Sequence, residues 1–167
     1  DGLSNYAVWA PDLPGFGASP AMPDAEHTVE NLAHVVNQLA QRLDAPALLG
    51  HSFGSVIAAY AVHQRPFAYR HLVLLNPIAR PALAAQSRMD RAATAVTNSF
   101  YQVAATLPPT MGRQLLSNRL IVWATGAFMT KTDDPRVLAY THDQHQAYFS
   151  AFESPEVLLE VYRASVQ

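Results

Sequence analysis

The sequence Ala47-Leu48-Leu49-Gly50-His51-Ser52-Phe53-Gly54 joins two segments with different hydrophobic patterns. Residues 47–49 form a short apolar run that ends at Gly50, which predicts a buried strand. Residues 53–64 carry small and apolar side chains and are followed by Pro66, which predicts a buried helix that ends before this proline. The junction, Gly50–Gly54, is therefore expected to form a sharp turn between strand and helix.

The junction Gly50–Gly54 matches the pattern G-x-S-x-G. Between a strand and a helix, this pattern holds its serine in a strained turn, the nucleophile elbow, with the hydroxyl above the sheet. We expect Gly50 and Gly54 to leave room for the crowded backbones, and His51 to turn away from the serine. Ser52 is the predicted nucleophile, and the Phe53 backbone N–H is the predicted donor to a developing oxyanion. The alternative is a glycine-flanked serine that only caps the helix.

The segments around this junction alternate between strand and helix patterns. Tyr6–Pro11 and His71–Asn76 are short apolar runs that end in turn residues, which predicts two further strands. Residues 28–43 carry apolar side chains at helical spacing behind Thr28, a plausible N-cap. Three strands joined by helices predict an α/β fold with a parallel sheet. Because each strand is apolar throughout, we expect both faces of the sheet to be covered.

The second half of the chain lacks strand patterns. Helices are predicted for residues 92–107, 111–127, 135–152 and 155–166, with proline-containing breaks between some of them. The sequence therefore predicts two regions, a partial α/β core over residues 1–77 and a helical region over residues 78–167.

The loop after the first predicted strand carries a second motif, Asp12-Leu13-Pro14-Gly15-Phe16-Gly17-Ala18-Ser19. Its two glycines also suggest a dinucleotide-binding loop, but Pro20 occupies the third glycine position and no helix follows directly. Asp12 is expected to order the loop through hydrogen bonds. Together with the elbow, this loop resembles the α/β-hydrolase family, in which a D-x-x-G-x-G-x-S loop follows the strand two before the nucleophile helix. Asp12, Gly15, Gly17 and Ser19 all match that pattern.

The resemblance covers residues 6–77 by motif and implies an α/β-hydrolase core. By position and helicity, residues 78–167 look like the cap that many such hydrolases insert. The aromatic side chains of this region are candidates to line an apolar substrate pocket, with ordinary core packing as the alternative. They are Phe100, Tyr101, Trp123, Phe128, Tyr140, Tyr148 and Phe149.

The resemblance also implies catalytic partners that residues 1–167 do not supply. In this family the order along the chain is serine, acid, then histidine. The resemblance therefore implies an acid and a histidine beyond Gln167, and a second oxyanion donor before Asp1. Some members place the acid after the strand that follows the nucleophile helix, but this chain has the amide Asn76 there. We therefore expect the chain to be the middle of a longer hydrolase.

Of the seven histidines, His142 and His145 are the candidates to face a pocket, because they are three residues apart on one predicted cap helix. No third ligand stands out beside them, so no metal site is predicted. The other five are expected to lie away from Ser52, with His27 and His34 on the surface.

The composition excludes several classes of function. Eleven Lys and Arg against thirteen Asp and Glu give a net charge of −2. This charge balance does not indicate binding to nucleic acid or to an anionic membrane. With no cysteine, the chain has no disulfide, no thiol nucleophile and no cysteine-ligated metal. No apolar run reaches the roughly 18 residues of a membrane-spanning helix. No signal peptide is visible either, so the cytoplasm is the default expectation.

The sequence therefore predicts a serine-nucleophile hydrolase that acts without a cofactor on a small, largely apolar ester, amide or related substrate. Two alternatives stay open. One is a haloperoxidase or lyase of the same fold, because G-x-S-x-G does not separate these activities. The other is a non-catalytic member that binds a ligand or a protein partner. The sequence leaves the oligomeric state open.

Overall fold

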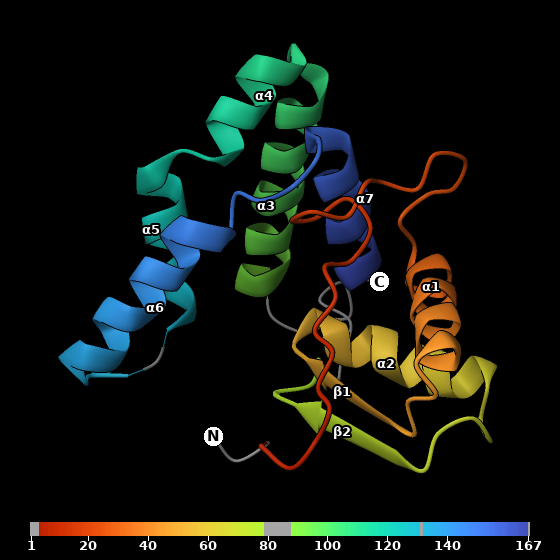
Figure 1. The fold of residues 1–167 in the computed structure, drawn as a ribbon. Helices are drawn as coiled ribbons and strands as arrows, with labels where there is room; N and C mark the ends of the chain where they lie inside the picture. The colour runs from red at the N-terminus through yellow and green to blue at the C-terminus, as the bar shows by residue number, and fades with distance from the viewer. Residues whose placement is uncertain (1–3, 79–87, 131, 167) are drawn as a thin grey trace.

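The computed structural model describes residues 4–78, 88–130 and 132–166 of the chain. Residues 79–87, at the start of the predicted cap, therefore lie outside the described residues, as does the side chain of Phe128. In chain order the elements are α1 (Val29–Arg42), β1 (Ala47–His51), α2 (Phe53–Gln64), β2 (His71–Leu75), α3 (Arg88–Thr106), α4 (Pro109–Leu116), α5 (Arg119–Met129), α6 (Pro135–Tyr148) and α7 (Pro155–Val166) (Figure 1).

The two strands form a parallel pair joined through α2. The register aligns Ala47 with His71 and His51 with Leu75, so the carboxyl ends of both strands lie at the same edge. Helix α2 begins at this edge and runs back across the sheet (Figure 1). The predicted parallel α/β arrangement is therefore confirmed for these two strands.

The predicted strand at Tyr6–Pro11 is wrong. This segment has no regular secondary structure and pairs with no strand of the described residues, and the side chains of Tyr6 and Trp9 are 71% and 65% exposed. Within the described residues, the sheet has two strands, not three. An apolar run becomes a strand only where a neighbouring strand satisfies its backbone N–H and C=O groups.

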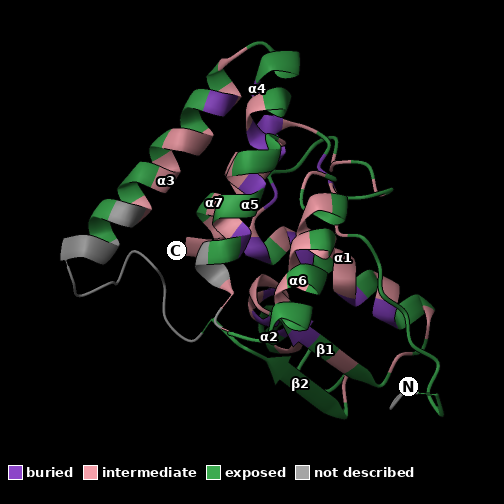
Figure 2. Cartoon of the chain, turned by 90° about the vertical axis from the view of Figure 1, so that its left-hand side faces the viewer, coloured by how far each residue is buried: buried purple, intermediate pink, exposed green. Residues whose placement is uncertain are grey.

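The expectation that both faces of the sheet are covered is also wrong for the described residues. Helix α2 packs on the sheet, but all five residues of β2 are exposed, and Gly50 is the only buried residue of β1. Figure 2 shows β2 in the exposed colour along its whole length. Apolar side chains such as Leu49 and Val73 therefore remain in contact with solvent.

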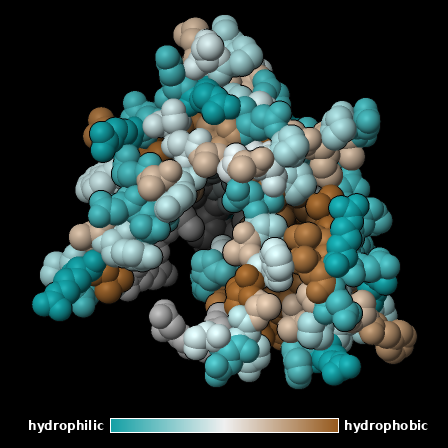
Figure 3. All heavy atoms as spheres, viewed as in Figure 1, coloured by the Kyte–Doolittle hydropathy of each residue, from teal (hydrophilic) through white to brown (hydrophobic). Residues whose placement is uncertain are grey.

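The main core lies between α1, α2 and α7. Its buried residues are Leu32, Ala33, Ile57, Ala61 and Val161. Figure 3 shows hydrophobic side chains gathered between α1 and α7, above α2. The predicted helix behind Thr28 is confirmed, because the Thr28 hydroxyl oxygen accepts a hydrogen bond from the Asn31 N–H at 3.2 Å.

The helical region differs from its prediction at two boundaries. The single helix predicted over residues 111–127 is two helices, because Ser117 ends α4 and the Asn118 side chain accepts the Leu120 N–H at 3.0 Å to begin α5. Helix α6 ends at Tyr148 rather than at residue 152, and the following segment turns back toward the loop at residues 12–19. The helix predicted over residues 155–166 is confirmed as α7.

The helices of the second half form two groups. Helices α3, α4 and α7 pack on one another around Ala104, Leu116 and Phe152, whereas α5 and α6 pack as a pair (Figure 1). Helix α7 also contacts α1, so it joins the helical region to the core. None of the helices in the described part of the chain has the length and apolar character needed to cross a bilayer.

Candidate active site

The elbow brings Ser52 to the carboxyl edge of the sheet in a strained conformation. Ser52 has φ 51° and ψ −121°, a positive φ that residues with a side chain rarely adopt. Such a backbone costs about 1–3 kcal/mol and persists only where the surroundings enforce it. Ser52 stands directly before the first residue of α2, yet its side chain makes no capping hydrogen bond. The hydroxyl is therefore not used to cap the helix.

Hydrogen bonds to the N–H and to the carbonyl of Ser52 hold this conformation. The Ser52 N–H donates to the Leu75 carbonyl at the end of β2, at 3.1 Å. The Ser52 carbonyl accepts the Ser55 N–H at 2.9 Å and the Ser55 hydroxyl at 2.5 Å. Phe53 follows as the first residue of α2, so its backbone N–H has no acceptor inside the helix.

The two glycines of the elbow have different roles. A Cβ at Gly50 would lie 2.3 Å from the Gly54 carbonyl oxygen and 2.8 Å from the Ser55 Cα, so strand and helix cross too closely there for any side chain. A Cβ at Gly54 would meet no atom within 4 Å. The expectation that both glycines supply room is therefore correct for Gly50 and wrong for Gly54.

The loop at residues 12–19 is ordered by Asp12, as expected. The Asp12 carboxylate accepts the Ala18 N–H at 2.9 Å, and the Asp12 carbonyl accepts the Ser19 hydroxyl at 2.8 Å. Gly17 has φ 54°, and a Cβ there would lie 2.2 Å from the Asp12 carboxylate. Asp12 thus has a structural role in this loop, and Gly17 allows its carboxylate to lie against the backbone.

The same loop is bonded to the segment that precedes α7. The Gly17 N–H donates to the Ala151 carbonyl, and the Glu153 N–H donates to the Gly15 carbonyl, both at 2.8 Å. Phe16 and Phe152 form an isolated antiparallel bridge between these contacts. No sequence signal indicates this pairing, because the two segments are far apart in the chain.

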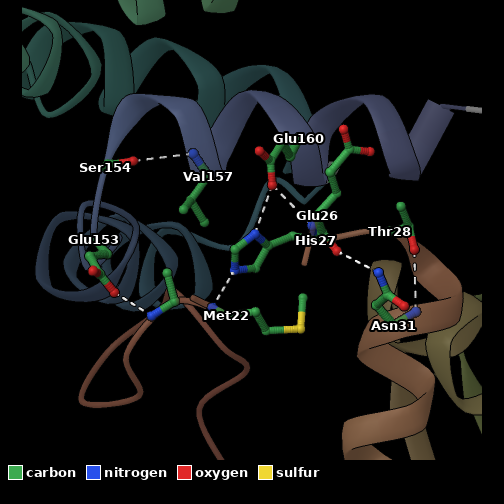
Figure 4. Close-up of polar contacts among 10 residues, drawn as sticks. Met22, Glu26, His27, Thr28, Asn31, Glu153, Ser154, Val157 and Glu160 are labelled. Atoms are coloured by element: carbon green, nitrogen blue, oxygen red, sulfur yellow. Dashed lines mark hydrogen bonds and ion pairs between the residues drawn. The ribbon is translucent and has the colours of Figure 1, made fainter. Parts of the chain in front are cut away.

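His27 also links this loop to α7 (Figure 4). It is buried, so its predicted surface position is wrong. His27 is 2% exposed, and its Nδ1 lies 2.8 Å from the Glu160 carboxylate of α7. Its Nε2 accepts the Met22 N–H at 3.2 Å, so the hydrogen-bond pattern assigns the ring proton to Nδ1. Glu160 also accepts the His27 backbone N–H at 2.9 Å. His34 is exposed, as expected.

His142 and His145 face α5. A Cβ added at Gly126 would lie 2.5 Å from Nδ1 of His145 and 3.6 Å from Nδ1 of His142, and the His142 ring stacks on Trp123 at 5.8 Å. Both Nδ1 atoms are buried without a hydrogen-bond partner. Across the described part of the chain, no three histidine, aspartate or glutamate side chains gather as metal ligands.

The hydroxyl of Ser52 has neither a histidine nor a carboxylate as a hydrogen-bond partner among residues 4–78, 88–130 and 132–166. Asn76, which stands where some family members place the acid, follows β2 with φ 45°. It therefore lies at the same sheet edge as the elbow, one residue beyond the carbonyl that holds the Ser52 N–H.

The predicted pocket aromatics divide into two sets. Phe100 and Tyr101 contact each other on α3, and Tyr101 also packs against Tyr162 of α7, with 4.7 Å between the ring centres of the two tyrosines. The predicted residues of α5 and α6 and the residue after α6 are instead exposed, namely Trp123, Tyr140, Tyr148 and Phe149. The structure has one cleft lined by residues that include Gln41 and Tyr69, and another lined by residues that include Tyr60 and Glu160. Ser52 lines neither of these two clefts.

Comparison with known proteins supports an α/β-hydrolase fold. The family model described as "Alpha/beta hydrolase family" matches residues 1–164. A mutant of the haloalkane dehalogenase DatA from Agrobacterium tumefaciens C58 has a similar crystal structure, with a TM-score of 0.50 and 18% sequence identity. The match covers 93% of this chain and 56% of that one, so the chain spans little more than half of the dehalogenase. No curated protein matches the sequence. Because the family model matches nearly the whole of this chain, the chain belongs to the alpha/beta hydrolase family.

Proposed function

We propose that the protein is a serine-dependent hydrolase that cleaves an ester, amide or related bond in a small, largely apolar molecule. The observation that carries the proposal is the Ser52 backbone, which is held at φ 51° between a strand and a helix with a hydroxyl that caps nothing. A strained, non-glycine residue at such a turn is typical of a functional site.

In the proposed reaction, the Ser52 oxygen attacks the carbonyl carbon of the substrate while a histidine takes the hydroxyl proton. The Phe53 N–H donates to the oxyanion that develops on the carbonyl oxygen. The histidine then protonates the leaving group, and an acyl group remains on Ser52 until water removes it. We propose that the histidine and its acid come from outside residues 1–167. The mechanism requires no cofactor.

We propose that residues 1–77 are part of the catalytic core and that residues 78–167 act as its cap. Helices α5 and α6 pack as a pair and leave Trp123, Tyr140 and Tyr148 exposed. Exposed aromatic rings on a cap favour an apolar substrate, because ligand pockets are lined mainly by such side chains.

The proposal is tested by hydrolysis of a series of p-nitrophenyl esters by the complete native protein and two variants. Ser52→Ala is expected to lower kcat by at least about 10³-fold, because the nucleophile is lost. Ser99→Ala, at an exposed position on α3, is the matched control and should keep wild-type activity. Equal activity of Ser52→Ala and Ser99→Ala would show that Ser52 is not the nucleophile.

One observation favours a second candidate, a non-catalytic member that binds a ligand or partner. Within the described residues, no histidine or carboxylate hydrogen-bonds the Ser52 hydroxyl, and a serine without a base is a poor nucleophile. This candidate predicts that the wild-type protein hydrolyses no ester in the series and that Ser52→Ala binds the same ligands as the wild type.

A further inference from the structure

Ser55 lies one turn into α2 and is the most buried polar side chain near the elbow, at 2% exposure. Its hydroxyl donates to the Ser52 carbonyl at 2.5 Å and accepts the Ile78 N–H at 3.3 Å. A serine hydroxyl has a single proton. Because the Ile78 N–H occupies the acceptor side of the oxygen, that proton is directed to the Ser52 carbonyl.

The Ser52 carbonyl belongs to the same peptide unit as the Phe53 N–H. A peptide unit is planar, so the direction of the carbonyl fixes the direction of the N–H on its other side. The Ser55 hydroxyl and the Ser55 N–H both bind this carbonyl. A hydrogen bond to the carbonyl also polarises the peptide and makes its N–H a stronger donor.

We infer that Ser55 is a positioning residue for the oxyanion donor: its hydroxyl fixes the Ser52–Phe53 peptide so that the Phe53 N–H points at the developing oxyanion. This inference rests on the proposed function. It also makes Ile78, at the start of the proposed cap, part of the same hydrogen-bonded chain, because the Ile78 N–H holds the Ser55 hydroxyl in place.

Two donors bind the carbonyl of the strained residue Ser52. The Ser52 carbonyl stands at the start of α2, where one backbone donor of the helix reaches it. The N–H of Ser55 alone binds the carbonyl at 2.9 Å. The shorter bond from the hydroxyl supplies the second donor, and two donors restrict rotation of the peptide plane more than one does.

The test measures the rate at which a fluorophosphonate probe labels Ser52 in the complete native protein, together with kcat and KM for an ester that the protein hydrolyses. Ser55→Ala is expected to lower the labelling rate and kcat on the order of tenfold, with KM unchanged. The loss is smaller than the roughly 10²–10³-fold loss of a direct oxyanion donor, because the Phe53 N–H itself remains. Ser55→Thr keeps the hydroxyl and should restore the rate to within about threefold.

Ser154→Ala is the matched control. The Ser154 hydroxyl accepts the Val157 N–H at 3.3 Å at the start of α7, so its loss removes a hydrogen bond far from the elbow. The control should label at the wild-type rate even if its melting temperature falls. A purely structural Ser55 would lower the melting temperature in Ser55→Ala and leave the labelling rate unchanged, which would overturn the inference alone. A wild-type protein that the probe does not label would overturn the proposed function and this inference with it.

Discussion

Gly50 and Gly54 look equivalent in the G-x-S-x-G pattern, but the structure requires glycine only at the first position. A Cβ at residue 50 would collide with backbone atoms of Gly54 and Ser55, which cannot move aside without displacing the start of α2. A Cβ at residue 54 would enter open space. The motif identifies the turn, whereas the crossing of strand and helix decides which glycine is necessary.

The two glycines therefore provide a matched pair of substitutions. Gly50→Ala is expected to lower the free energy of unfolding by roughly 3 kcal/mol or more, because the clash is with backbone. Gly54→Ala should leave it unchanged or raise it by up to about 1 kcal/mol, because alanine favours the helix. Urea unfolding of both variants measures the difference, and an equal loss in the two would contradict this account of the elbow.

His27 is a second residue at which the local sequence pattern and the tertiary packing differ, because it is predicted on the surface but is buried. In the sequence it stands before a helix among polar residues, a position typical of the surface. Its burial depends on Glu160, which is 133 residues further along the chain. A contact between such distant residues leaves no local pattern, so sequence reasoning from one chain could not find it.

At the scale of the elements, the loop at residues 12–27 is hydrogen-bonded to α7 and to the segment before α7. Backbone bonds join Gly15 and Gly17 to residues 151–153, and His27 joins the end of the loop to Glu160. Leu13, Phe16 and Met22 pack against the core cluster that Phe53 also contacts. The connection to α7 thus supports a loop that packs on the same core cluster as the first residue of α2.

His27→Ala is expected to lower the free energy of unfolding by about 1–3 kcal/mol, because it leaves the Met22 N–H and the Glu160 carboxylate without the ring as a partner. His34→Ala, on the exposed face of α1, should change it by less than about 0.5 kcal/mol. Chemical denaturation of the two variants gives both values. A His27→Ala protein as stable as His34→Ala would show that the contact contributes nothing.

The contact between α3 and α7 predicts a loss of stability at alkaline pH. Burial raises the pKa of Tyr101 above its ordinary value, and Tyr162 beside it raises that pKa further. The folded protein therefore holds this proton more strongly than the unfolded chain does. The resulting stability is fully present below about pH 10 and is lost as the pH rises through the raised pKa.

Tyr101→Phe should consequently lose stability less steeply than the wild type from about pH 10 upward. Tyr140→Phe, at a side chain that is 66% exposed, is the control and should follow the wild-type curve. Unfolding by urea at a series of pH values measures both slopes. Parallel curves for Tyr101→Phe and the wild type would exclude this tyrosine as the source of the alkaline loss.

At the scale of the whole molecule, the sequence predicts the order of helices and strands better than it predicts their strand partners and their solvent exposure. Strand and helix patterns located β1, α2, β2 and α7, and the two motifs indicated the family before any comparison. The patterns failed where the outcome depends on a neighbour. Tyr6–Pro11 has the composition of a strand but no partner strand, and β2 has the composition of a covered strand but is exposed.

The prediction for the candidate site divides in the same way. The motifs predict the strained turn at Ser52 and the ordered loop at Asp12, and the structure has both, because each motif has a local geometry. The sequence does not indicate the contacts of Ser55, because one of them depends on the position of Ile78 after β2. His142 and His145 were placed on one helix correctly, but their rings face Gly126 of α5, which the spacing of two histidines does not reveal.

The central claim is that Ser52 is a nucleophile, and one measurement tests it most directly. The complete native protein is treated with a fluorophosphonate probe, digested, and analysed by mass spectrometry to locate the modified residue. The account predicts a single adduct on Ser52 that is absent from Ser52→Ala and present in Ser99→Ala. An adduct on another residue, or no adduct in the wild-type protein, would contradict it.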